Sequence, residues 1–256
     1  SSYHKLRHQI RINYTNVLRR LEKQHGDLQI AEIKARVVLA WHKDWSAGGK
    51  HIPMAKVFIG MLRTVIGFGA VMLEDPECIR LKLVLSGMRF EMPKPRSVHL
   101  TADMANAVRA QAHAWGWHSI ALAQALQFEL TLRQKDVIGE WVPLREPGAS
   151  EIVWSHQKWL HGLRWTEIDQ NMILKHVTSK TGKELEVNLR HAQMVQEELA
   201  MMIERDGALP LTGAMVRAEQ TGKPWVAAEF RRKWRWVAKA AGVPDNIRNM
   251  DSRSGA

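Results

Sequence analysis

The segment EMPKPRS at residues 91–97 divides the sequence into two parts with different patterns. Two prolines and two basic residues, placed between helical patterns, are typical of a linker. The part before this segment shows only helical periodicity, whereas the part after it mixes helical patterns with a strand-rich section. The sequence therefore predicts an α+β protein that is mainly helical with a small β-sheet. We expect a helical domain at 1–92, a linker at 93–97 and a mixed domain at 98–256.

Apolar residues recur three and four positions apart in several stretches of the first part, which predicts helices. These stripes are most simply the core-facing surfaces of a small helical bundle. The opposite side of the first helix carries basic residues that include Arg19 and Arg20, which either contact phosphate or form a solvated face. The stripes span residues 6–21, 30–45, 54–72 and 79–88.

Two strand patterns separated by a short turn are the clearest feature of the second part. The runs ILKHV at 173–177 and ELEVNL at 184–189 flank the sequence SKTGK. The second run alternates apolar and polar residues, which predicts a half-buried strand. Gly182 supplies the turn, so we expect Lys180 at or just before the tip of a β-hairpin.

The net charge of +11 and the sequence pI of about 10.0 indicate a polyanionic partner. Nucleic acid is the leading candidate because contacts between basic side chains and phosphate dominate its binding. A helix predicted over 229–242 concentrates this charge opposite an apolar face that contains Phe230 and Trp234. We expect its basic residues to contact phosphate, although a solvated face has the same composition. They are Arg231, Arg232, Arg235 and Lys239.

Several classes of protein are disfavoured by composition. Apolar runs such as VVLAW at 37–41 are too short to span a bilayer, and the N-terminal residues lack the apolar centre of a secretory signal. The single cysteine, Cys78, excludes an internal disulfide. We therefore expect a cytoplasmic protein with no membrane partner. The twelve histidines show no metal-ligand spacing, so no metal or other cofactor is expected.

Arg133 falls on the apolar side of a helix predicted over about 119–138, three residues after Leu130. A partly buried guanidinium requires an anion. Asp136 could form a purely structural ion pair with it, or could hold the guanidinium in place for a phosphate. These residues alone leave both interpretations open.

The order of these motifs resembles that of the tyrosine recombinases, the phage-integrase family, over essentially the whole chain. Arg133 and Asp136 match the family's first catalytic arginine and the acidic residue three positions later. Residues LRW at 163–165 and ID at 168–169 match the segment that leads into the hairpin, and Lys180 in TSKTGK matches the catalytic lysine. Arg253 matches the arginine of a His-x-x-Arg motif, in which Met250 stands at the expected histidine position.

This resemblance implies a SAM-like core-binding bundle at 1–92 and a catalytic domain at 98–256 that is incomplete at its C-terminal end. It implies a site-specific DNA recombinase that cleaves and rejoins double-stranded DNA through a covalent 3′-phosphotyrosine. Arg133 and Arg253 would clamp the phosphate, while Lys180 would protonate the leaving 5′ oxygen. The complete protein would be bacterial or phage-derived and nucleoid-associated, and would act as a tetramer on DNA.

The nucleophile is the main departure from the family pattern. The two tyrosines, Tyr3 and Tyr14, lie in the first predicted helical region and do not match its position. Met250 cannot exchange a proton. We therefore expect a chain that stops before the nucleophile segment, inactive alone and monomeric or weakly dimeric. The alternative is a catalytically inactive DNA-binding protein that retains the integrase scaffold, and a third hypothesis is a helical interaction protein with incidental positive charge.

Overall fold

The computed structural model describes residues 2–254, and the chain divides into two compact units, Ser1–Arg96 and Ser97–Ala256. Each unit has a hydrophobic core of its own. Residues 88–101, which contain the two prolines of the predicted linker, have no regular secondary structure. The two units are therefore best understood separately.

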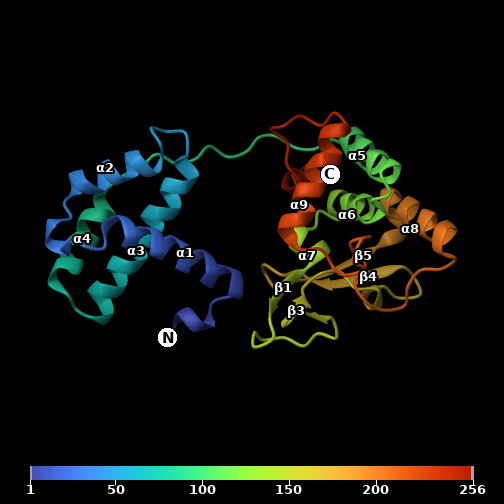
Figure 1. Ribbon diagram of the computed structural model, residues 1–256, viewed down its shortest axis with the longest axis horizontal. Coiled ribbons are helices and arrows are strands. Elements are labelled where there is room, and N and C mark those ends of the chain that lie inside the picture. The colour runs from blue at the N-terminus through green and yellow to red at the C-terminus, as the bar shows by residue number, and fades with distance from the viewer. Residues whose placement is uncertain (1, 255–256) are drawn as a thin grey trace. The chain divides into compact units, whose positions relative to one another are not determined.

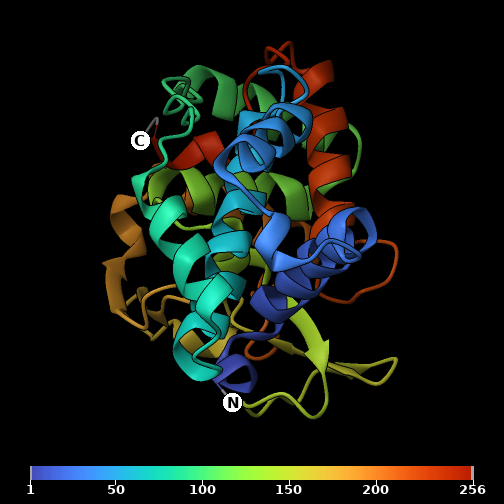
Figure 2. The ribbon, with the colours of Figure 1, turned by 90° about the vertical axis from the view of Figure 1, so that its left-hand side faces the viewer.

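Unit 1 is a helical bundle that is organised around one long central helix, α3. This helix packs against α1, α2 and α4, and Figure 2 shows α3 and α4 side by side in cyan and green. The helical stripes predicted from the sequence are confirmed, and Cys78 is a buried core residue as expected. The helices are α1 (His8–His25), α2 (Ala35–Trp45), α3 (Ile52–Met72) and α4 (Pro76–Gly87), with short 3-10 turns η1 (Ser2–Lys5) and η2 (Ile30–Glu32).

The central helix α3 is long and apolar enough to cross a membrane by length and composition, with a mean hydropathy of 1.6. A helix of this kind was not predicted from the continuous apolar runs of the sequence, which are shorter. In the structure, 44% of this apolar window is buried inside the fold. A helix that packs against several neighbours is apolar on more than one side. The buried side of α3 belongs to the core of unit 1, while other large apolar side chains of this helix are exposed, namely Met54, Val57, Val65, Phe68, Val71 and Met72.

Unit 2 is built around the buried helix α6 (His118–Glu129). Every residue from Ser119 to Phe128 is buried, which explains why this helix is apolar on all sides. In Figure 1, α5 lies on one side of α6 and the strands lie on the other. The helices that surround α6 or its neighbours are α5 (Ala102–Ala114), α7 (Gln134–Ile138), α8 (Gln193–Asp206) and α9 (Ala227–Ala240).

Two small antiparallel sheets complete unit 2. One contains β1 (Glu140–Pro143), β2 (Val153–Trp154) and β3 (Gln157–Leu160) in the order β1-β3-β2. The other is the predicted hairpin, in which β4 (Ile173–Val177) pairs with β5 (Glu184–Asn188). The mainly helical α+β class is confirmed.

Gly139 allows the backbone to pass close to the buried indole of Trp159. Its φ is +72°, and a Cβ there would lie 2.2 Å from Nε1 of Trp159 and 2.7 Å from the carbonyl oxygen of Leu160. We expect Gly139→Ala to destabilise unit 2 by at least about 1–3 kcal/mol from backbone strain, with the clash added. Gly207→Ala is the matched control for urea denaturation, because Gly207 has φ +84° and a Cβ there would have no neighbouring atom within 4 Å. Equal losses of unfolding free energy in both variants would exclude a packing role for Gly139.

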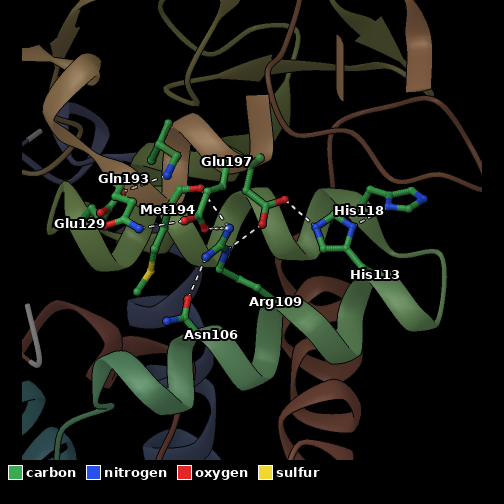
Figure 3. Close-up of polar contacts among 10 residues, drawn as sticks. Asn106, Arg109, His113, His118, Glu129, Gln193, Met194 and Glu197 are labelled. Atoms are coloured by element: carbon green, nitrogen blue, oxygen red, sulfur yellow. Dashed lines mark hydrogen bonds and ion pairs between the residues drawn. The ribbon is translucent and has the colours of Figure 1, made fainter. Parts of the chain in front are cut away.

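A buried ionic network joins α5 to α8 (Figure 3). The Arg109 side chain is 6% exposed, and its Nε donates to Oε1 of Glu198 at 2.7 Å. Nε2 of His113 lies 2.8 Å from the other oxygen of Glu198, and its Nδ1 lies 2.9 Å from Nδ1 of His118. Burial, followed by the charge of Arg205, lowers the pKa of His118 and so favours its neutral form. The network fixes the packing of α5 on α8.

Candidate functional site

A buried carboxylate, that of Asp136 in α7, lies at the centre of the predicted site. Its Oδ1 accepts a hydrogen bond from the backbone N–H of Ser179 at 2.6 Å. Its Oδ2 has no hydrogen-bond partner and lies 4.0 Å from Nη1 of Arg133. Since Ser179 immediately precedes Lys180, this one side chain connects the arginine to the turn that carries the lysine.

Arg133 lies at the N-cap of α7, so the prediction of one helix over 119–138 was wrong. The α6 helix ends at Glu129, and Thr131 adopts a left-handed conformation with φ +50° that no helix can continue through. The break leaves the Thr131 carbonyl outside a helical ladder, where Nε of Arg253 donates to it at 2.7 Å. The break between α6 and α7 therefore leaves the carbonyl of Thr131, two residues before Arg133, free to bind Arg253.

Arg253 reaches this position because the 3-10 segment η5 (Asn249–Ser254) is docked on α6. Asn249 and Gln127 exchange two side-chain hydrogen bonds of 2.9 and 3.0 Å, and both residues are buried. Gln124 donates to the hydroxyl of buried Ser252 at 3.2 Å. Within this polar run, Asn249, Asp251 and Ser252 are thus buried in unit 2.

The charges of the two arginines act on each other. Burial, and then the positive charge of Arg133, lowers the pKa of Arg253, while Asp136 opposes this effect. Two guanidinium groups that repel each other beside one carboxylate would be stabilised by an added oxyanion. Arginine suits this role because its donors form a planar fork that matches phosphate oxygens.

Lys180 lies in the turn of the β4–β5 hairpin and is exposed, as the sequence predicted for its position. The turn is closed by hydrogen bonds between Thr178 and Lys183 and between Gly182 and Thr178, each 2.9 Å. Gly182 has φ +67°, which glycine adopts at little cost. Met250, three residues before Arg253, is also exposed. The catalytic roles assigned to these residues stay predictions.

The two residues that hold η5, Gln124 and Gln127, were not predicted from the sequence. Both are completely buried in α6, and Oε1 of Gln124 also accepts from Nε1 of Trp234 at 2.8 Å. A signal was present, because two glutamines three positions apart interrupt the otherwise apolar run ALAQALQF. A buried amide on an apolar helix requires partners, which here come from residues more than 100 positions away.

One of the basic residues assigned to DNA contact has a different environment in α9. Arg235 donates to the carbonyl of Ile247 at 2.7 Å and to Oδ1 of Asp245 at 3.0 Å. It therefore holds the chain that leads from α9 into η5. Arg231 and Lys239 are exposed on α9, whereas Arg232 forms an ion pair with Glu229.

In unit 1, the two arginines predicted to contact DNA differ in their packing. Arg19 is exposed on α1. The guanidinium of Arg20 lies 4.8 Å from the ring centroid of Phe58, so its stem and charge also cover the core. Within residues 2–254, no group of three or more His, Cys, Asp or Glu side chains could hold a metal ion.

Structures of other proteins superpose on this chain. A lambda integrase dimer bound to a COC′ core site matches with a TM-score of 0.72 and 17% identity, over 98% of this chain and 78% of that chain. A lambda integrase tetramer bound to a Holliday junction matches with a TM-score of 0.71 and 17% identity, over 98% of this chain and 64% of that chain. The Tn1549 transposon integrase in complex with transposon right end DNA matches with a TM-score of 0.58 and 14% identity, over 98% of this chain and 80% of that chain. No protein-family model and no curated protein matches the sequence.

These identities establish the fold alone, and they confirm at that level the predicted resemblance to tyrosine recombinases. The chain spans less than two thirds of the longer lambda integrase chain. Since one fold can carry different functions, the activity has to be argued from the site itself.

Proposed function

We propose that the protein containing this chain is a site-specific recombinase that cleaves and rejoins double-stranded DNA through a covalent 3′-phosphotyrosine. This chain would supply the phosphate clamp and much of the DNA-binding surface. The observation that carries the proposal is the position of Asp136, which accepts a hydrogen bond from Ser179 beside Lys180 and lies 4.0 Å from the guanidinium of Arg133. The contact of Arg253 with the Thr131 carbonyl adds the second arginine.

In this mechanism a tyrosine hydroxyl attacks the phosphorus and displaces the 5′ oxygen of the DNA strand. Arg133 and Arg253 bind the non-bridging oxygens, where negative charge increases in the transition state. Lys180 donates a proton to the departing 5′ oxygen, which leaves as a hydroxyl group. Rejoining runs the same steps in reverse and releases the tyrosine. Neither Tyr3 nor Tyr14, which belong to unit 1, is proposed as the nucleophile.

By analogy with the lambda integrase dimer and tetramer, we propose that the complete protein assembles as a homo-oligomer on DNA. A cytoplasmic location without a membrane partner accompanies this proposal. The second candidate function is a DNA-binding protein that has kept this scaffold without catalysis. Met250 favours it, because a thioether at the position expected for histidine can neither give nor accept a proton.

Duplex binding measured against salt concentration tests both candidates. We expect the logarithm of the affinity to fall linearly with the logarithm of salt, with a slope of about −0.9 for each phosphate contact. Arg231→Gln and Lys239→Gln should each reduce that slope by about 1, because both side chains are exposed on α9. Arg205→Gln on α8 is the control, since Arg205 is already paired with Asp206. If no duplex binds even at low salt, both DNA functions are excluded and the helical interaction protein remains.

A further inference from the structure

Three neighbouring tryptophans form a patch on the surface of unit 2. Trp115 is 43% exposed and Trp236 is 48% exposed. Trp117 lies between them, with its ring centroid 5.4 Å from that of Trp115 and 6.4 Å from that of Trp236. Clustered exposed aromatic rings usually mark an interaction site, because they would otherwise be buried. We call Trp115, Trp117 and Trp236 the tryptophan patch.

Local backbone structure exposes Trp115 and Trp236, whereas Trp117 between them is partly buried and packs against the core of unit 2. Trp115 is the C-cap residue of α5 and Trp117 is the N-cap residue of α6, on either side of Gly116. Gly116 has φ +68°, which makes the turn between the helices tight. On α9, Trp234 points into the core with 1% exposure, and Trp236 two residues later faces outward. The patch is therefore formed by one residue of α9 and by the two residues that cap α5 and α6.

Cations are interleaved with these rings. Nζ of Lys233 lies 4.6 Å from the ring centroid of Trp117 and 4.9 Å from that of Trp236. The guanidinium of Arg232 lies 5.4 Å from the Trp236 centroid. These cation–π contacts hold the rings in place, so a ligand that binds them loses little further side-chain freedom.

We propose that the tryptophan patch binds unpaired nucleotides of single-stranded DNA. An exposed strand offers phosphates to Lys233 and Arg232 and flat bases to the indole rings, which is the combination that sequence-independent single-strand binding uses. The bases of an intact duplex are stacked on one another and cannot stack on side chains. Apart from Arg235, which holds the chain that leads into η5, the α9 helix carries the basic residues Arg231, Arg232, Lys233 and Lys239 against one acidic residue, Glu229, which favours a polyanion. This inference goes beyond the proposed duplex binding, because phosphate contacts alone require no exposed tryptophan.

Fluorescence anisotropy with a labelled oligothymidine tests the proposal on the full chain. We expect Trp236→Ala to weaken binding at least about five-fold and Trp236→Phe to keep most of the affinity, because phenylalanine still stacks on a base. An oligomer of abasic sites with the same phosphates should bind more weakly than oligothymidine. Trp154→Ala is the matched control, because Trp154 is also 43% exposed, pairs with Trp141 and has Nζ of Lys223 at 4.3 Å from its ring.

Three results would overturn the proposal. Equal affinity for the abasic oligomer would mean that only charge is recognised. An equal loss of oligothymidine affinity in Trp154→Ala would mean that binding does not depend on the tryptophan patch in particular. Competition by polyglutamate as strong as that by oligothymidine would identify an acidic protein as the partner. Duplex affinity of Trp236→Ala, measured in parallel, separates this proposal from the proposed function, because we expect it to be unchanged.

Discussion

Replacing Arg109 with leucine is expected to destabilise unit 2 by about 3–5 kcal/mol. The substitution leaves the carboxylate of Glu198, whose side chain is 2% exposed, buried without its guanidinium partner. It also removes donors to Glu197 and to the backbone carbonyl of Met194, which lie 2.9 and 3.2 Å away. Hydrogen exchange of the α6 amides, followed by mass spectrometry, measures this loss within unit 2, and urea denaturation measures it for the chain.

Two further variants show whether the buried charge is the cause. Glu186→Gln breaks the exposed ion pair with Lys175 and should cost no more than about 1 kcal/mol. The double variant Arg109→Leu with Glu198→Leu removes both buried charges, so much of the lost stability should return. A single Arg109→Leu that costs no more than Glu186→Gln would contradict the expectation, and so would simple additivity in the double variant.

Replacing Arg253 with alanine is expected to slow strand cleavage about 10²–10³-fold in a protein that contains this chain and its nucleophile. The Arg253 guanidinium is positioned by the Thr131 carbonyl next to Arg133, and in the proposed mechanism it meets charge that develops only in the transition state. Arg253→Lys should recover little, because an ammonium cannot reproduce the planar fork. Single-turnover cleavage of a nicked duplex, at saturating protein, measures the chemical step apart from binding.

Arg205→Ala serves as the control for this experiment. Arg205 is a basic residue of α8 that already pairs with Asp206, so its loss should leave the saturated rate intact. A saturated rate for Arg253→Ala that stays close to that of the parent protein would remove Arg253 from the proposed clamp. If the parent protein binds duplex but does not cleave it, the non-catalytic scaffold becomes the better description.

Most helices and the hairpin could be predicted because their signals are local. The apolar stripe that becomes α3 and the alternation of Leu185 with its neighbours in β5 repeat over a few residues, within the periods of a helix and a strand. Arg133, Lys180 and Arg253 were singled out by the order of their motifs along the chain, which resembles that of tyrosine recombinases, and not by residue type alone. The helix break at Thr131 was missed because Leu130 and Leu132 are both buried, so the apolar pattern continues through the break.

The sequence by itself determined the kinds of elements, their order and the basic residues from which a phosphate site could be made. Only the tertiary structure decided how these residues meet, since the contacts of Asp136 with Ser179 and of Arg253 with Thr131 join positions 43 and 122 residues apart. Tertiary packing also places Arg235 where it donates to the Ile247 carbonyl and holds the chain that leads into η5, and it leaves Trp236 at the surface. Periodicity records which side of an element is buried, whereas hydrogen bonds between distant segments depend on three-dimensional packing, which a one-dimensional pattern does not contain.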